Sequence, residues 1–146
     1  MPLEEEVLRQ TLGGVGLGTW LLLRESAPGY DPLSPEAPLI FAMSPMVGTP
    51  LTTSAKFAVV SKSPLTDRIN DALSSSSFAL AAKGAGLDAL VVVGACEHPS
   101  VLILDGEAER METYIEDAND LWGLSPAATD EALQTRLAAP RGRAHA

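Results

Sequence analysis

Three short apolar segments, each the length of a β-strand, mark the middle of the chain. They run over Leu39–Met43, Phe57–Ser61 and Leu87–Val93, and the Val- and Leu-rich composition of the last predicts a buried strand. The intervening segments are rich in Pro, Gly, Ser and Thr, which favour turns or hold polar ligands with backbone N–H groups. The pattern therefore predicts a sheet whose connecting loops are candidates for a binding site.

Two helices are predicted before the first strand. Glu4–Leu12 carries acidic residues in its first turn, where the helix dipole favours them. Leu17–Ser26 follows, with Leu17, Leu21 and Trp20 as its core-facing positions. The glycines of Gly13–Gly18 are expected to break the first helix and to let the second pack closely against the sheet.

The glycine pattern GGVGLG also resembles part of a dinucleotide-binding fingerprint. That fingerprint requires a strand before the glycines and an acidic residue about twenty positions after them. A charged helical segment precedes them here, and the candidate acids Asp31 and Glu36 lie in a Pro-rich connection. The context therefore argues against dinucleotide binding.

Two further helices and a hairpin are predicted after the second strand. Leu65–Ala72 leads into a serine turn, Ser74–Ser77, that caps a helix over Phe78–Lys83.

Asp105-Gly106 predicts a tight hairpin turn between strands at Val101–Leu104 and Ala108–Met111. The loop Asp117–Gly123 holds Trp122 as an expected packing anchor. A last helix is expected from Ser125-Pro126 to about Leu137, with core positions at Ala128, Leu133 and Leu137.

Length and composition favour one globular domain over residues 1–137, with a disordered tail over 138–146. The chain has 146 residues, of which 46% are apolar. No apolar run reaches the ~18 residues that a membrane span needs. The N-terminal segment is acidic, unlike a signal peptide, so the cytoplasm is the expected location.

The charge pattern excludes one class of partner and suggests another. The net charge is −9, which argues against nucleic acid, since phosphates require Lys and Arg clusters. Residues 97–131 hold ten acidic residues and one basic residue, whereas residues 39–94 hold four basic and three acidic residues. The strand region is the local exception, so it either suits an anionic ligand or has few charges because it is buried.

Cysteine and histidine are too sparse for an obvious metal or catalytic site. Cys96 is the single cysteine and follows an apolar strand, so a buried, inert thiol is expected. His98 and His145 are far apart and lack a surrounding set of cysteines or carboxylates, whereas good metal sites need three or four convergent ligands. No Ser-His-Asp arrangement or acid/base pair of carboxylates stands out.

Five pieces of the chain, in order and with their spacing, carry a family resemblance. They are GGVGLGTWLLLRE at Gly13–Glu25, DPLSPEAPLIFAMSPMVGTP at Asp31–Pro50, KFAVVSKSPLT at Lys56–Thr66, KGAGLDALVVVGACEHP at Lys83–Pro99 and DANDLWG at Asp117–Gly123. Together they resemble the N-terminal domain of the tungsten-dependent aldehyde:ferredoxin oxidoreductases, over roughly Glu5 to Leu137. A run of pieces is far more specific than one short motif.

The resemblance implies a fold, a cofactor and partners. The implied fold is α+β, with mixed β-sheets and short helices. Family catalysis uses a tungsten or molybdenum ion held by two pyranopterins, together with a [4Fe–4S] cluster on four cysteines. This chain cannot bind that cluster with one cysteine, so a partner chain carrying the cysteine-containing domains, and ferredoxin through it, are implied. A homo-oligomer is a further possibility.

The resemblance also nominates four cofactor-binding residues by position: Lys56, Ser74, Ser75 and Ser76. Lys56 stands where the family tends to have Arg, which keeps the charge but loses the bidentate fork that suits phosphate. The three serines stand near an Asn-Ser-Gly-Gly turn of the family and would act through backbone N–H groups at a helix N-terminus. A solvated Lys at a strand end and a simple helix cap are the structural alternatives.

Three interpretations of function follow. The first is the cofactor-facing domain, or a split subunit, of an aldehyde oxidoreductase that forms a carboxylate and passes electrons to ferredoxin. The second is a non-catalytic assembly module that has lost cofactor binding, because Leu73, Ser75 and Ser76 depart from the family turn. The third is a remnant whose missing strands leave sheet edges exposed.

Overall fold

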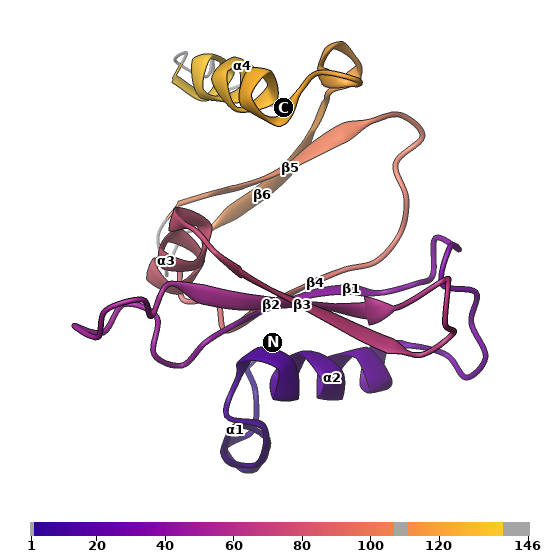
Figure 1. The fold of residues 1–146 in the computed structure, drawn as a ribbon, viewed down its shortest axis with the longest axis vertical. Helices are drawn as coiled ribbons and strands as arrows, with labels where there is room; N and C mark the ends of the chain where they lie inside the picture. Colours follow the sequence, from indigo (N-terminus) through magenta and orange to yellow (C-terminus); the bar gives the residue numbers. More distant parts are fainter. Residues whose placement is uncertain (1, 107–110, 139–146) are drawn as a thin grey trace. The chain divides into compact units, whose positions relative to one another are not determined.

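The computed structural model describes residues 2–106 and 111–138 and divides into two compact units. The first unit comprises residues 1–95 and 104–112, and the second comprises residues 96–103 and 113–146. The chain is α+β, as expected, with short helices and two sheets (Figure 1). The one-domain boundary at 137 stays a prediction, and the tail expected over 139–146 lies outside the described residues.

A four-stranded sheet with order β3-β2-β1-β4 forms the centre of the first unit. All three of its strand pairings are antiparallel. Its strands are β1 (Leu39–Met43), β2 (Lys56–Lys62), β3 (Ile69–Ser75) and β4 (Ala89–Val92). The three strands predicted from the sequence therefore share one sheet, and an unexpected fourth, β3, lies at its edge.

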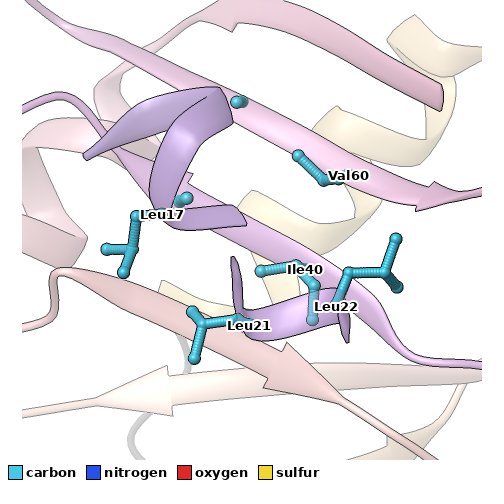
Figure 2. Packing of buried hydrophobic residues seen from close by; sticks show 7 residues of the cluster. Leu17, Leu21, Leu22, Ile40 and Val60 are labelled. Carbon is cyan, nitrogen blue, oxygen red and sulfur yellow. The ribbon is translucent and has the colours of Figure 1, made fainter. Parts of the chain in front are cut away.

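Helix α2 (Gly14–Glu25) covers one face of this sheet, after the short helix α1 (Glu5–Thr11). Leu17, Leu21 and Leu22 of α2 are buried against alternate residues of β1 and β2, as the sequence predicts for the first two (Figure 2). On the sheet side these are Ile40, Ala42, Ala58 and Val60. Trp20 packs at the border of the cluster, half-buried.

The glycine segment Gly13–Gly18 forms the N-cap and the first turn of α2. Gly13 is its N-cap with φ +120°, and Gly14 is its first residue. A Cβ on Gly18 would lie 2.6 Å from Val60 Cγ2, so glycine here lets the helix approach β2 closely. The expectation of close packing is confirmed, and the expectation that the helix starts only at Leu17 is wrong by three residues.

Helix α3 (Ser77–Gly84) lies on the opposite face of the sheet (Figure 1). Its Phe78 ring is 5.2 Å from that of Phe57 and 6.0 Å from that of Phe41, both edge-on. Gly86, with φ +80°, ends the helix, because the N–H groups of Gly86 and Leu87 close back onto the carbonyls of Lys83 and Ala82. Glycine suits this position because its φ is positive.

Strand β4 is a half-buried edge strand, so the prediction of a fully buried strand over Leu87–Val93 is wrong. It pairs with β1 alone among the described strands. An apolar segment indicates a strand, but it does not show whether that strand lies at the centre or at the edge of a sheet. That position depends on elements that are distant in sequence.

The second sheet pairs β5 (Ser100–Asp105) with β6 (Glu112–Asp117). The first predicted hairpin strand is confirmed, but the second begins at Glu112, later than the predicted Ala108–Met111. Most of that predicted segment, residues 108–110, lies outside the described residues. The prediction of a two-residue turn at Asp105-Gly106 is therefore wrong, because six residues separate the two paired strands.

The second unit also holds a 3-10 turn, η1 (Asn119–Leu121), and α4 (Pro126–Ala138). Ser125 caps α4 as predicted, since its Oγ accepts the N–H of Ala128 at 3.3 Å. Leu133 and Ala128 are only half-buried, and Leu137 is exposed. Trp122 is 79% exposed and is not the packing anchor that was expected.

Candidate functional site

Lys56 and Ser75, two of the four nominated residues, meet at one end of the sheet. Lys56 begins β2, Ser75 ends β3, and the two are directly paired across the ladder. The Lys56 ammonium donates a hydrogen bond to Ser75 Oγ at 3.1 Å, although the residues are 19 positions apart. Both side chains are exposed, so the ammonium keeps two of its three donor positions available to a ligand.

Ser76 caps helix α3. Its backbone is extended (φ −161°), and its Oγ accepts the N–H of Phe78 at 3.2 Å. The predicted capping role is confirmed. The cap satisfies the Phe78 N–H, and the Ala79 N–H donates to the Ser76 carbonyl at 3.2 Å, so these two amides of the helix N-terminus already have acceptors.

Ser74 and Ser75 lie within strand β3, so the predicted serine turn over Ser74–Ser77 is wrong. Ser74 pairs with Phe57 and Ser75 with Lys56. Neighbouring residues of a strand point to opposite faces, so Ser74 does not join Lys56 and Ser75. Strand β3 was missed because INDALSS lacks both the β-branched run and the alternation that indicate a strand.

The Lys56–Ser75 pair provides a hydrogen-bond donor suited to an anion, because the Lys56 ammonium carries a full positive charge. By strand alternation, both side chains share the face of Ala58 and Val60, whereas α3 packs on the opposite face. The pair is therefore a cationic site that is open to solvent.

The two hollows found in the first unit lie elsewhere. One, of about 430 Å³, is lined by the end of α1, the glycine N-cap of α2 and the loop after β1. The other, of about 500 Å³, is lined by Leu3, Leu21 and residues 86–89 and 91. None of the four nominated residues lines either hollow. A ligand held by Lys56 and Ser75 would thus rest on an exposed surface.

A polar cluster around Tyr30 was not anticipated from the sequence. Lys62, at the end of β2, donates to the Tyr30 carbonyl at 2.9 Å, pairs with Asp67 at 2.5 Å and lies 5.0 Å from the Tyr30 ring. Burial raises the pKa of the Tyr30 hydroxyl, against the lowering effect of Lys62. The contacts tie the Pro-rich connection to the β2–β3 turn, which is a structural role.

Cys96 is exposed, so the expectation of a buried thiol is wrong. The apolar strand ends at Val92, and the chain has already left the sheet at Cys96. Among the described residues no group of three or more His, Cys, Asp or Glu side chains converges on a metal position. No helix in residues 2–106 and 111–138 is long and apolar enough to cross a membrane.

The implied pterin cofactor fits this site in part. Its anionic groups suit the Lys56 ammonium that Ser75 holds at the end of the sheet. The exposed position of this pair does not enclose a large organic group. The residues present can therefore form one wall of such a site.

Comparison with known proteins agrees with the sequence pattern. Residues 1–145 match the model of the family "Aldehyde ferredoxin oxidoreductase, N-terminal domain". The tungsten-containing aldehyde ferredoxin oxidoreductases of Pyrococcus abyssi and Pyrococcus furiosus are both 39% identical, over 91% and 92% of this chain. A P. furiosus protein named aliphatic sulfonate oxidoreductase, WOR-like subunit, is 32% identical over 84% of the chain.

A solved structure shows the same fold. It is the active site complex BamBC of benzoyl coenzyme A reductase with 1,5-dienoyl-CoA, which superposes with a TM-score of 0.84 over 97% of this chain at 27% identity. The chain spans only about a fifth of the length of these relatives: 21% of the P. abyssi protein and of the BamBC chain. The full-length family match shows that this chain belongs to the family of aldehyde ferredoxin oxidoreductase N-terminal domains.

Proposed function

We propose that this chain is the cofactor-facing domain, or a split subunit, of a tungsten- or molybdenum-dependent oxidoreductase. The proposed reaction oxidises an aldehyde to a carboxylate, with ferredoxin as electron acceptor. The aldehyde is favoured as substrate because the 39%-identical relatives carry that activity in their names. The metal–pterin group would supply the redox chemistry when bound.

The observation that carries this proposal is the Lys56–Ser75 contact at the end of the sheet, in a chain of this family. In the proposed role the Lys56 ammonium binds an anionic group of the pterin. Ser75 holds the ammonium at the end of the sheet by accepting its hydrogen bond.

A second polypeptide is part of the proposal. A [4Fe–4S] cluster requires four cysteine thiolates, and this chain contributes at most one, Cys96. The partner would carry the cysteine-containing domains, since this chain matches only 21% of the length of the P. abyssi relative. It would also close the exposed face beside Lys56 and exclude water from the cofactor.

A second candidate function is a non-catalytic assembly module. The incorporation of Ser74 and Ser75 into a paired strand favours it, because strand pairing removes the turn that would present several backbone N–H groups to a ligand. Under this alternative, Lys56 and Ser75 contact another protein and not a cofactor.

Metal and pterin content distinguish the two candidates. The tagged chain is purified anaerobically from its own cells grown with tungstate and molybdate, together with any bound polypeptide. Tungsten and molybdenum are measured by mass spectrometry, and pterin by its fluorescence after oxidation. The proposal expects metal and pterin in a complex with a cysteine-rich partner, whereas a stable but metal-free complex favours the assembly module.

Site variants make this experiment specific. Lys56→Ala and Ser75→Ala are expected to lower metal and pterin retention. Lys83→Ala, which removes a lysine from the other end of α3, is the matched control and is expected to retain both. Equal retention in Lys56→Ala and the control would contradict the role of Lys56.

A further inference from the structure

The outer edge of β3 is uncovered on both faces and along its length. All seven residues from Ile69 to Ser75 are exposed, and β2 is the sole strand paired with β3 among the described residues. Leu73 is 68% exposed, and Ile69 is also exposed. The buried cluster beneath α2 contains residues of α2, β1 and β2 but none of β3.

This edge carries little of the usual protection against strand addition. Exposed edge strands commonly carry Lys or Pro, or are shortened by a bulge. Strand β3 carries neither Lys nor Pro, and Asp71 is its single charged residue. A strand of this kind offers its unpaired N–H and C=O groups to a further strand.

We propose that β3 pairs antiparallel with β3 of a second copy of this chain, about a two-fold axis at Leu73. In this register Leu73 lies beside Leu73 of the second copy. Asp71 lies opposite Ser75 of the second copy, and the relation repeats by symmetry. Side chains directly opposite in such a pair have Cβ atoms about 5 Å apart.

Charge complementarity selects this register. Ser75 already accepts a hydrogen bond from Lys56 at 3.1 Å, so Asp71 of one copy reaches the Lys56 ammonium of the other. The described structure shows no ion-pair partner for Asp71 within its own chain. The pairing therefore gives two symmetric Asp71–Lys56 contacts flanking an apolar centre.

Neighbouring registers are worse. A two-fold axis at Asp71 places two carboxylates side by side, and like charges directly opposite destabilise a strand pair. An axis at Ala72 places each Asp71 beside Leu73 of the other copy, with no cation. Of these three registers, the axis at Leu73 alone brings Asp71 beside a cation.

The dimer is distinct from the cofactor complex. Both use Lys56 and Ser75, so the pairing describes the chain without cofactor and excludes binding of the pterin at the same edge. Its contact is a single strand edge, smaller than a standard interface, so the affinity is expected to be modest. The equilibrium should shift with protein concentration.

Sedimentation velocity on the isolated chain, over about a hundred-fold range of concentration, tests the proposal. A monomer–dimer equilibrium is expected for the wild-type chain. Leu73→Lys should weaken dimerisation by about tenfold or more, since two ammonium groups then meet at the axis. Leu23→Lys, the same change at a comparably exposed site on α2 (65%), is the control and should dimerise normally.

Exchanging the charges of Asp71 and Lys56 tests the register of the strand pair independently of the contact between the two Leu73 side chains. Asp71→Lys and Lys56→Asp should each weaken the dimer, and the double variant should restore it. Amide hydrogen exchange should show protection of β3 that rises with concentration in the wild type. A chain that stays monomeric, a dimer insensitive to Leu73→Lys, or a double variant without rescue would each overturn the proposal.

Discussion

Strand β2 has very different neighbours on its two sides. On the β1 side the two strands share a buried cluster, because Ala58 and Val60 of β2 and Ile40 and Ala42 of β1 are all completely buried beneath the leucines of α2. Toward β3, the ladder is complete, but every residue of the neighbouring strand is exposed. The comparison shows that backbone pairing alone does not make a core, because apolar burial requires a covering layer as well.

The packed side provides stability, and the exposed side provides a surface. Under α2, small residues let the layers approach, as at Gly18 against Val60. Along β3, the donors of Lys56 and Ser75 and the apolar Leu73 remain free to contact another molecule. Both proposals depend on the exposed side of β2. The variants that test them should therefore leave the packed core under α2 intact.

The largest expected contrast is between two leucines. Leu22→Ala removes a side chain that is 2% exposed and should lower the free energy of unfolding by about 2–5 kcal/mol. Leu73→Ala makes the same change on β3 and should alter it by less than ~0.5 kcal/mol in dilute solution. Urea denaturation followed by circular dichroism measures both, and similar losses would contradict the comparison.

Next in size is Gly18→Ala. The new methyl group would lie 2.6 Å from Val60 Cγ2, so helix and strand must separate, which typically costs about 1–3 kcal/mol. Better helix propensity returns up to about 1 kcal/mol of this. Adding Val60→Ala should recover part of the loss, because it removes the contacted methyl groups. The midpoint of urea denaturation provides the measurement, and a stabilised single variant would contradict the close contact.

A smaller effect is expected at the cap of α3. Ser76→Ala removes the acceptor of the Phe78 N–H and should cost about 1 kcal/mol. Ser74→Ala, two residues earlier on exposed β3, has no cap to lose and should be near neutral. Thermal melts of the two variants measure the difference, and equal melting temperatures would argue against the cap.

The smallest expected effect is electrostatic and lies in the second unit. A hydrogen bond from Arg136, at 2.5 Å, lowers the pKa of the Asp120 carboxyl below its ordinary value of 3.8. A lowered pKa contributes stability above 3.8 that is lost as the pH falls through the folded-state value. Arg136→Gln should return the Asp120 pKa toward the ordinary value in an NMR titration, whereas Gln134→Ala on the same helix should leave it lowered.

Much of the first unit could be predicted from local pattern. The apolar runs at Leu39–Met43 and Phe57–Ser61 are strands, and Leu17 and Leu21 face the core. Capping residues also mark helix ends reliably, as at Ser76 and Gly86, because they satisfy backbone groups within a few residues. Local chemistry of this kind depends little on the rest of the fold.

The candidate site was predicted only in part. Lys56 and Ser75 were nominated separately by position, and the structure joins them in a hydrogen bond. Ser74 was assigned to a turn because INDALSS has no strand pattern, yet pairing with β2 makes it a strand. Trp122 and Cys96 were expected to be buried from their residue types, but burial depends on which elements cover them.

The sequence by itself determined the family, the α+β class, two helix N-caps and three of the four strands of the central sheet. Each of these follows from neighbouring residues or from the order of motifs along the chain. Only the tertiary structure decided that β3 joins the sheet, that Lys56 meets Ser75 across it, and that this edge is exposed. These features depend on strand register and on the absence of a covering layer, which bring together residues that no local pattern relates.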